Sequence, residues 1–362
     1  VGSEMCIRDR SNDDLVNTQL NVLMIFSYMQ PIMNIILNLS VVAVIKVGGI
    51  QVANGSVTPG NVMAAITYVT QSLNAVMRMT NMFQTASRGI ASGRRINEVL
   101  ACEPSIKDGS FNATTSIKGK IEFKNVTFAY PLTGDKKILD NINLVINPGE
   151  TIGILGETGC GKTSLINLIP RFYDVCEGSV LVDDIDVREY NLKNLRERIS
   201  VALQKSEIFQ STIKENIRWG RENATDTDIA NAASIAQAME FISTSTDGFD
   251  TLVTQQGTSL SGGQKQRIAI SRTILKQSEI IIFDDATSAL DLKTEASLYS
   301  MLKNAYPDIT KIIIAQRIAS VKDADRIVIL DDGHISAVGT HDQLLKNSAI
   351  YQDIYNSQLN KK

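Results

Sequence analysis

The residues at 156–163 read Gly-Glu-Thr-Gly-Cys-Gly-Lys-Thr, which is the spacing of a phosphate-binding loop. An apolar run at 151–155 precedes them and an apolar-periodic run follows, as the required strand, loop and helix order demands. Backbone amides of the loop would surround phosphates, Lys162 would reach the terminal two, and the Thr163 hydroxyl would bind Mg²⁺. The predicted nucleotide-binding residues are Gly156, Glu157, Thr158, Gly159, Cys160, Gly161, Lys162, Thr163 and Ser164.

A second feature is a pair of carboxylates, Asp284 and Asp285, directly after the apolar run at 280–283. A continuous apolar run is typical of a parallel strand that is covered on both faces. Open α/β sheets bind ligands at the carboxyl ends of such strands. We therefore expect Asp284 to bind Mg²⁺. Two solvated aspartates at a strand end are the commoner arrangement in general, but the matching phosphate loop favours the metal site.

A third feature is the pentapeptide Leu-Ser-Gly-Gly-Gln between those two motifs, and a helix is expected from Ile268 onward. The backbone N–H groups and positive end of a helix that follows a glycine-rich turn attract an anion such as phosphate. An ordinary helix-capping turn is the alternative for so short a motif. The residues concerned are Leu260, Ser261, Gly262, Gly263 and Gln264.

In this order the motifs resemble the ATP-binding cassette (ABC) family, specifically exporters of the multidrug or lipid type that join membrane helices and an ATPase domain in one chain. The resemblance implies that Tyr130 stacks on adenine and that Gln204 touches Mg²⁺ and relays to the membrane domain. It also implies a loop that crosses a dimer interface, formed by Ser288, Ala289, Leu290 and Asp291. In the family, two cassettes dimerise head to tail, and each ATP lies between one subunit's phosphate loop and the other's residues 260–264.

Two positions depart from the family pattern. Hydrolytic members carry glutamate where this chain has Asp285, and histidine where it has Gln316. Aspartate is shorter by one methylene, so its carboxylate should fall short of the attacking water, and glutamine cannot become a cation. A positioned base typically contributes about 10²–10⁴ in rate. We therefore expect ATP binding with weak hydrolysis, in the non-catalytic half of a heterodimer. A slow homodimer and a regulatory protein that never transports remain alternatives.

The composition limits other functions. The formal net charge of -3 gives no reason to expect nucleic acid as a partner. The four cysteines show no paired spacing, so all are expected to be reduced thiols. The chain has only two histidines, so few residues are available for a histidine metal site or a Ser-His triad.

The first hundred residues are expected to form a membrane hairpin. Residues 22–47 and 61–83 are apolar and long enough to cross a bilayer, which needs about twenty residues. The spans carry polar residues that either line a translocation route or bond the helices together; these are Gln30, Asn34, Asn38, Thr67, Thr70, Gln71 and Asn74. The basic residues Arg88, Arg94 and Arg95 place the following end in the cytoplasm. A multi-pass protein of the cell (inner) membrane is the expected result, with the lipid bilayer, a second exporter half and a transported lipid, peptide or drug as partners.

The expected domains follow. Residues 1–20 are a non-native or disordered segment, and 21–100 are the last two of six membrane helices that the resemblance implies, so the chain is expected to be truncated at its N-terminus. Residues 101–118 are a polar linker. Residues 119–362 are an α/β phosphate-loop cassette with an antiparallel β subdomain and an α-helical subdomain, the latter formed by residues 223–249 and the pentapeptide.

Overall fold

The computed structural model describes residues 2–113, 118–131, 136–205, 207–254 and 257–359. The chain divides into two compact units, Val1–Pro104 and Ser105–Lys362. We call the first the hairpin and the second the cassette, and each is described by itself.

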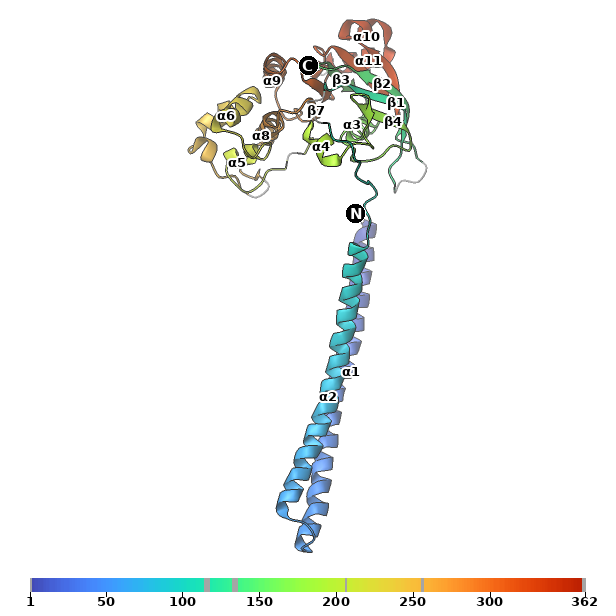
Figure 1. The fold of residues 1–362 in the computed structure, drawn as a ribbon, viewed down its shortest axis with the longest axis vertical. Coiled ribbons are helices and arrows are strands. Elements are labelled where there is room, and N and C mark those ends of the chain that lie inside the picture. The colour runs from blue at the N-terminus through green and yellow to red at the C-terminus, as the bar shows by residue number, and fades with distance from the viewer. Residues whose placement is uncertain (1, 114–117, 132–135, 206, 255–256, 360–362) are drawn as a thin grey trace. The chain divides into compact units, whose positions relative to one another are not determined.

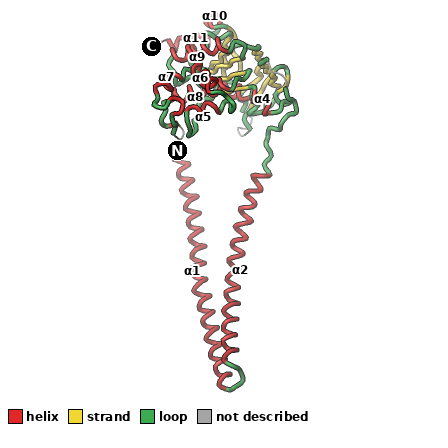
Figure 2. The backbone as a smooth tube through the Cα atoms, turned by 60° about the vertical axis from the view of Figure 1, so that its left-hand side comes forward, coloured by secondary structure: helices red, strands yellow, loops and turns green. Residues whose placement is uncertain are grey.

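The hairpin consists of two long helices joined by a short turn (Figure 2). They are α1 (Gly2–Ala53) and α2 (Pro59–Leu100), of 52 and 42 residues. At about 1.5 Å per residue, α1 is about 78 Å long, whereas a hydrocarbon core is about 30 Å thick. Near the turn the helices lie close together, because a Cβ atom at Gly48 would lie 2.8 Å from the side chain of Val62. Both helices are therefore longer than a bilayer crossing requires.

Two expectations for this region concern the length of α1 and the number of membrane spans. Residues 2–20 are helical and continuous with the rest of α1, while residue 1 lies outside the described residues. The interpretation of residues 1–20 as a non-native segment stays a prediction. Within the described part of the chain, only one helix, at Asn12–Ala53, is long and apolar enough to cross a membrane. Helix α2 covers the second predicted span but includes Arg78 as well as amide and hydroxyl side chains, which lower its hydropathy.

The hydroxyl groups of α2 bond within their own helix. Thr67 Oγ1 donates to the carbonyl oxygen of Met63 at 2.9 Å, and Thr70 Oγ1 donates to that of Ile66 at 2.9 Å. Such bonds satisfy a hydroxyl in an apolar environment without a neighbouring helix. These two threonines therefore do not join α1 to α2. The side chain of Gln30, another predicted polar position, lies outside the described residues.

The cassette contains two sheets (Figure 1). The smaller is antiparallel, in the order β2 (Leu139–Ile146), β1 (Ile121–Phe128), β4 (Glu177–Val182), β5 (Ile185–Asp186). The larger has the order β10 (His334–Gly339), β9 (Arg326–Asp331), β3 (Thr151–Leu155), β8 (Thr310–Ile314), β7 (Ile280–Asp284), β6 (Ile199–Ala202). Only the β10–β9 pair in it is antiparallel. The predicted fold class is therefore confirmed.

The larger sheet is buried on both faces, as the apolar run at 280–283 predicted. Ile281 and Phe283 of β7 pack into one apolar cluster, and Ile280 and Ile282 pack into another on the opposite face. Because β3, β8 and β7 are neighbours and parallel, the segments that follow Leu155 and Asp284 leave the sheet at the same edge. This edge holds the candidate site.

The helices flank these sheets. Those of the cassette are α3 (Lys162–Asn167), α4 (Leu192–Glu197), α5 (Ile213–Arg218), α6 (Asp226–Ile235), α7 (Met239–Thr244), α8 (Gly262–Leu275), α9 (Leu292–Ala305), α10 (His341–Asn347) and α11 (Ala349–Leu359), with 3₁₀ turns at Gly248–Asp250 and Ile318–Ser320. Helices α5 and α6 pack on α8 and lie apart from the antiparallel sheet (Figure 1). This helical part includes α6, within the predicted range 223–249, and also α5, which lies before that range.

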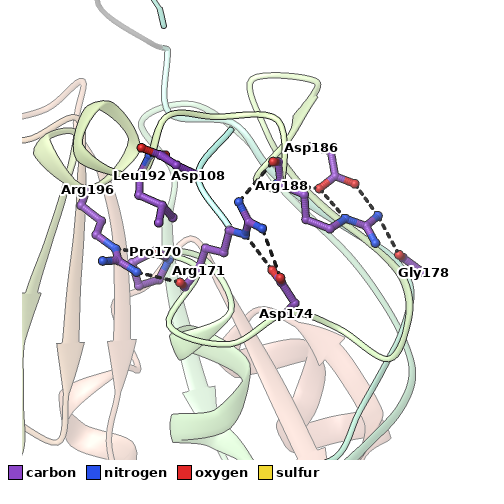
Figure 3. A network of polar contacts seen from close by, with 9 residues as sticks. All are labelled: Asp108, Pro170, Arg171, Asp174, Gly178, Asp186, Arg188, Leu192 and Arg196. Carbon is purple, nitrogen blue, oxygen red and sulfur yellow. Dashed lines mark hydrogen bonds and ion pairs between the residues drawn. The ribbon is translucent and has the colours of Figure 1, made fainter. Parts of the chain in front are cut away.

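The expected linker is partly docked on the cassette. Asp108 Oδ1 accepts a hydrogen bond from the backbone N–H of Leu192 at 2.6 Å, at the start of α4 (Figure 3). Phe111 forms a parallel bridge with Tyr190, and their rings meet edge to face at 5.0 Å. These contacts tie residues 108–111, which lie within the predicted linker, to the cassette.

Arg171 fixes the segment between α3 and β4. Its side chain is buried, and it donates two hydrogen bonds to the Asp174 carboxylate at 2.7 and 3.1 Å (Figure 3). A third bond reaches the carbonyl oxygen of Arg188 at 3.1 Å. Arg196 donates to the carbonyl oxygens of Pro170 and Arg171. A bidentate pair and a third hydrogen bond hold this buried guanidinium firmly, so the backbone beyond the phosphate loop is anchored.

Candidate nucleotide-binding site

The predicted phosphate loop connects β3 to α3. A Cβ atom at Gly156 would lie 2.1 Å from the carbonyl oxygen of Leu330, which no side chain tolerates. Gly161, directly before α3, has φ of 103°, a conformation that favours glycine. Both glycines are therefore required by the backbone path, which turns sharply from strand to helix.

Lys162 is folded back onto the loop. Its ammonium donates to the carbonyl oxygens of Gly156 at 2.7 Å and Glu157 at 2.6 Å. The sulfur of buried Cys160 lies 3.6 Å from the same nitrogen. A phosphate anion in the loop would be a stronger partner for the ammonium than neutral carbonyls are. The cation is thus already in place beside the loop.

Thr163 and Asp284 provide a cluster of oxygen atoms. Thr163 Oγ1 lies 3.1 Å from both carboxylate oxygens of Asp284. Burial raises the pKa of the Asp284 carboxyl above its ordinary value, while the Thr163 hydrogen bond opposes that rise. A divalent cation would relieve the cost of burying this charge. The donor set therefore fits Mg²⁺, which prefers oxygen ligands and usually keeps water and phosphate oxygens as well.

The metal fit depends on a phosphate ligand. In the described ranges, no group of three or more His, Cys, Asp or Glu side chains is arranged to hold a metal ion by itself. Thr163 and Asp284 line one cavity together with the predicted third ligand, Gln204. Such a site binds Mg²⁺ mainly with its nucleotide rather than as a free ion.

Asp285 is held by two carboxamides. Gln204 Nε2 and Gln316 Nε2 donate to the same oxygen, Asp285 Oδ2, at 3.1 and 2.9 Å. Its backbone has φ of 50°, an uncommon conformation for a residue other than glycine. Burial raises the pKa of the carboxyl, and the two amide hydrogen bonds oppose that rise. The tertiary structure thus brings together the three predicted catalytic residues, but with the carboxylate already engaged.

Tyr130 lies at the rim of the same cavity, which has a volume of about 290 Å³. Its hydroxyl is 2.9 Å from Ser164 Oγ, and its ring meets those of Phe128 and Tyr173 edge to face at 4.9 and 5.0 Å. The ring belongs to an aromatic cluster and also lines the cavity. Packing of Tyr130 in the core is therefore compatible with the predicted stacking on adenine.

The pentapeptide at 260–264 starts a helix earlier than predicted. Helix α8 begins at Gly262 instead of Ile268, because Ser261 and Gln264 form a reciprocal capping box. Ser261 and Gly262 are exposed. None of the five described residues of the pentapeptide lines the 290 Å³ cavity. The turn is thus open to another molecule rather than to this chain's own phosphate loop.

The predicted dimer loop connects β7 to α9. Asp291, its last residue, is the N-cap of α9 and accepts hydrogen bonds from the backbone N–H groups of Lys293 and Thr294 at 3.1 and 3.0 Å. Ser288, Ala289 and Asp291 are exposed, whereas Leu290 is buried. The last residue of the loop is therefore held by hydrogen bonds, whereas its first two residues are exposed to solvent.

Comparison with known proteins identifies the cassette. Residues 139–288 match the family profile described as ABC transporter. This match includes the phosphate loop, the pentapeptide and both aspartates of the 284–285 pair. This part of the chain is an ABC transporter ATP-binding domain.

Longer matches extend the similarity to the helices. The chain is 40% identical over 332 residues to an ATP-dependent lipid A-core flippase of Desulfotalea psychrophila, covering 91% of this chain and 58% of the flippase. It is 36% identical over 353 residues to a fatty acid ABC transporter ATP-binding/permease protein of Mycobacterium bovis, covering 97% and 56%. The chain thus spans less than two thirds of the length of these relatives. The similarity therefore extends beyond the ABC domain into the helical region of the chain.

A solved structure has a similar fold. A bacterial Atm1-family ABC exporter with ATP bound matches with a TM-score of 0.81 and 30% identity, over 90% of this chain and 57% of that chain. The fold of the matched part is therefore that of an Atm1-family ABC exporter, with a helical N-terminal region and an ABC domain built on a mostly parallel sheet and an antiparallel sheet.

Sequence reasoning missed residues of the ABC domain that hold the dimer loop. Buried Gln266 and half-exposed Arg317 both donate hydrogen bonds to it. Glu295, also buried, accepts a 2.5 Å bond from the Thr287 hydroxyl just before the loop. A glutamine within a helix carries no motif signal of its own, and the proximity of these side chains arises only on folding.

Proposed function

We propose that this chain is an ATP-binding subunit of an ABC-type exporter whose own site binds MgATP but hydrolyses it weakly. The phosphate loop, Lys162, Thr163 and Asp284 supply the binding determinants. Asp285 and Gln316 replace the glutamate and histidine that the family pattern has at these positions. We further propose that the chain pairs with a second, catalytically competent exporter half and contributes residues 260–264 to that partner's site.

One observation carries the proposal. Both Gln204 and Gln316 donate to Asp285 Oδ2. A general base must reach the proton that it removes within hydrogen-bond distance, directly or through one water. Asp285 has a short side chain, and one of its oxygens already has two donors. Neither feature affects the oxygens of Asp284, so binding is preserved while the positioned base is lost.

The membrane setting follows the same proposal. The segment Asn12–Ala53 meets the length and hydropathy of a bilayer crossing, and the similar proteins carry exporter names. We place the hairpin in the cell (inner) membrane and the ABC domain in the cytoplasm.

The test restores the glutamate and the histidine that the family pattern has at positions 285 and 316. In the complex of this chain with its partner half, Asp285→Glu together with Gln316→His should raise the ATPase rate at this site by about 10²-fold or more, because a base and a polarising imidazole are regained. Single-turnover hydrolysis of labelled ATP measures the rate. Asp285→Asn with Gln316→His is the matched control, since it regains the imidazole without a base and should stay slow.

Two outcomes would reject the degenerate site. If the purified chain alone shows brisk, saturable ATPase activity, its own site is competent and a homodimer is the better assignment. If the double variant hydrolyses ATP no faster than the unaltered complex, Asp285 and Gln316 do not limit hydrolysis. ATP-dependent transport in vesicles that contain the complex would identify an exporter. Absence of transport would favour a regulatory protein.

A further inference from the structure

The ABC domain has a cavity that is separate from the nucleotide site. It has a volume of about 440 Å³ and is lined mainly by α9, by β8 and by residues between 319 and 324. Of the described residues, none lines both this cavity and the 290 Å³ cavity of the nucleotide site. Pockets of about 300–1,000 Å³ are of the size that binds small organic molecules. We call it the α9–β8 cavity, and its buried lining residues decide which molecule fits.

Lys311 is a buried cation in the wall of this cavity. It is 3% exposed and lies in β8, where successive side chains alternate between the two faces of the sheet. Ile312 and Ile314 belong to one apolar cluster. Ile313 belongs to the cluster on the opposite face and lines the cavity together with Lys311. Strand alternation therefore places the Lys311 side chain on the cavity face.

The Lys311 ammonium has few partners for a buried charge. In the described part of the chain it donates one hydrogen bond, to the carbonyl oxygen of Ile309 at 2.7 Å, whereas an ammonium can donate three. Burial lowers the pKa of this ammonium, Asp325 opposes that change, and the positive charge of Lys303 adds to it. A buried charge costs free energy unless it is paired. An anionic group in the cavity would supply the missing acceptors.

The other buried charged residue of the described lining is already engaged. Glu295, on α9, is 3% exposed and accepts a hydrogen bond from the Thr287 hydroxyl at 2.5 Å. Lys303, Lys322 and Asp323 also line the cavity, and all three are exposed. Glu295 is thus satisfied within the chain, while the donors that remain for a ligand include three ammonium groups.

Apolar side chains form much of the remaining lining. Leu302 of α9 is fully buried and Ile313 of β8 is 3% exposed, whereas Leu292, at the start of α9, lines the cavity from an exposed position. Such a surface favours a hydrocarbon body, because water is released from both. The cavity therefore offers buried positive charge and apolar surface to the same small molecule.

We propose that the α9–β8 cavity binds a small organic carboxylate with a short hydrocarbon chain. The carboxylate accepts hydrogen bonds from Lys311 and lies near Lys303, and the hydrocarbon chain packs on Leu302 and Ile313. Charge-assisted hydrogen bonds are stronger than those between neutral groups, so a carboxylate binds more tightly than an amide of the same shape. This site goes beyond the proposed function, since its occupancy does not require MgATP at the phosphate loop.

The test measures binding of hexanoate to the full chain in detergent micelles by saturation-transfer difference NMR. Hexanoate should bind saturably. Hexanamide lacks the charge and acetate lacks the hydrocarbon chain, so each should bind about tenfold more weakly. Added MgATP should leave the affinity for hexanoate unchanged. Equal affinities for hexanoate and hexanamide would overturn recognition by the ammonium, and displacement of hexanoate by MgATP would place it at the nucleotide site instead.

Matched lysine variants locate the site. Lys311→Met keeps the length of the side chain without its ammonium, and should weaken hexanoate binding by about tenfold or more. Lys193→Met makes the same replacement at an exposed position on α4 and should leave the affinity unchanged. Lys303→Met should weaken binding by only about threefold, because solvent screens an exposed charge. Thermal melting confirms that each variant is folded.

Ala296→Trp tests the cavity without altering Lys311. Ala296 is an exposed lining residue of α9, so a large ring at this position fills part of the cavity from its solvent side, and hexanoate binding should be lost. Loss of binding in both Lys311→Met and Ala296→Trp, with binding retained in Lys193→Met, would support the site. Unchanged affinity in Lys311→Met or in Ala296→Trp, or no saturable binding to the unaltered chain, would overturn it.

Discussion

The nucleotide site has a binding end at Asp284 and a hydrolytic end at Asp285. These two ends differ although the residues are adjacent in sequence. Asp284 ends β7 and faces the Thr163 hydroxyl beside the phosphate loop. Asp285, the next residue, has φ of 50° and directs its carboxylate to the amides of Gln204 and Gln316. One end has the residues that the proposed MgATP binding needs, and at the other end, under the same proposal, Asp285 and Gln316 replace the glutamate and histidine of the family pattern. We therefore expect substitutions at the two ends to affect binding and hydrolysis separately.

The largest expected effect is on the binding end. Lys162→Ala should weaken MgATP binding by about 100-fold, because charge-assisted hydrogen bonds to phosphate contribute roughly 1.5–3 kcal/mol each. Asp285→Asn should change the affinity by less than about threefold, since this carboxylate belongs to the other end. Titration with a fluorescent ATP analogue measures both. Lys193→Ala, at an exposed position on α4, is the control. An equal loss in Asp285→Asn would remove the distinction between the two ends.

A smaller effect is expected at the rim. Tyr130→Ala should weaken ATP binding by about tenfold, because stacking of a base on an aromatic ring contributes about 1–3 kcal/mol. Tyr130→Phe keeps the ring and loses the hydroxyl contact with Ser164, so its affinity should be close to that of the unaltered chain. Calorimetric titration of ATP into both variants measures the difference. Equal losses in both would assign the effect to the hydroxyl and not to stacking.

The smallest effect is on stability. Asp284→Asn removes a buried charge and should raise the melting temperature of the nucleotide-free chain. The expected rise is about 2–4 °C for each kcal/mol gained in the free energy of unfolding. The sign follows from the raised pKa of Asp284: the folded chain holds its proton more tightly than the unfolded chain, so the charged carboxylate destabilises the fold at neutral pH. That cost is relieved as the pH falls through the raised pKa.

Melting curves at several pH values without nucleotide test this expectation. The stability gap between Asp284→Asn and the unaltered chain should be widest at neutral pH and should close toward acid pH. MgATP should reverse the order, because the ion needs the carboxylate. A gap that is independent of pH would show that burial of the charge is not its cause.

The motifs predicted much of this arrangement in advance. Glycines, a lysine and a threonine at fixed spacing between an apolar strand and a helix specify a phosphate loop, because each residue acts through its immediate neighbours along the chain. The apolar run at 280–283 similarly predicted a strand buried on both faces. The start of α8 was misplaced, since the capping box of Ser261 and Gln264 outweighed the expectation of a longer glycine turn. The polar composition of residues 101–118 predicts a linker but not its contact with the cassette, because Leu192, the partner of Asp108, is distant in sequence.

The sequence by itself thus determined the phosphate loop, the acidic strand, the two long helices and the two departures at positions 285 and 316. Only the tertiary structure decided that Gln204 and Gln316 share one oxygen of Asp285, and that Gln266 and Arg317 hold the dimer loop from opposite sides. Local motifs depend on contacts between neighbours in the chain, which spacing reveals. The shared contacts join residues at the ends of different strands and helices, and they exist only where parallel strands bring those ends to one edge of a sheet.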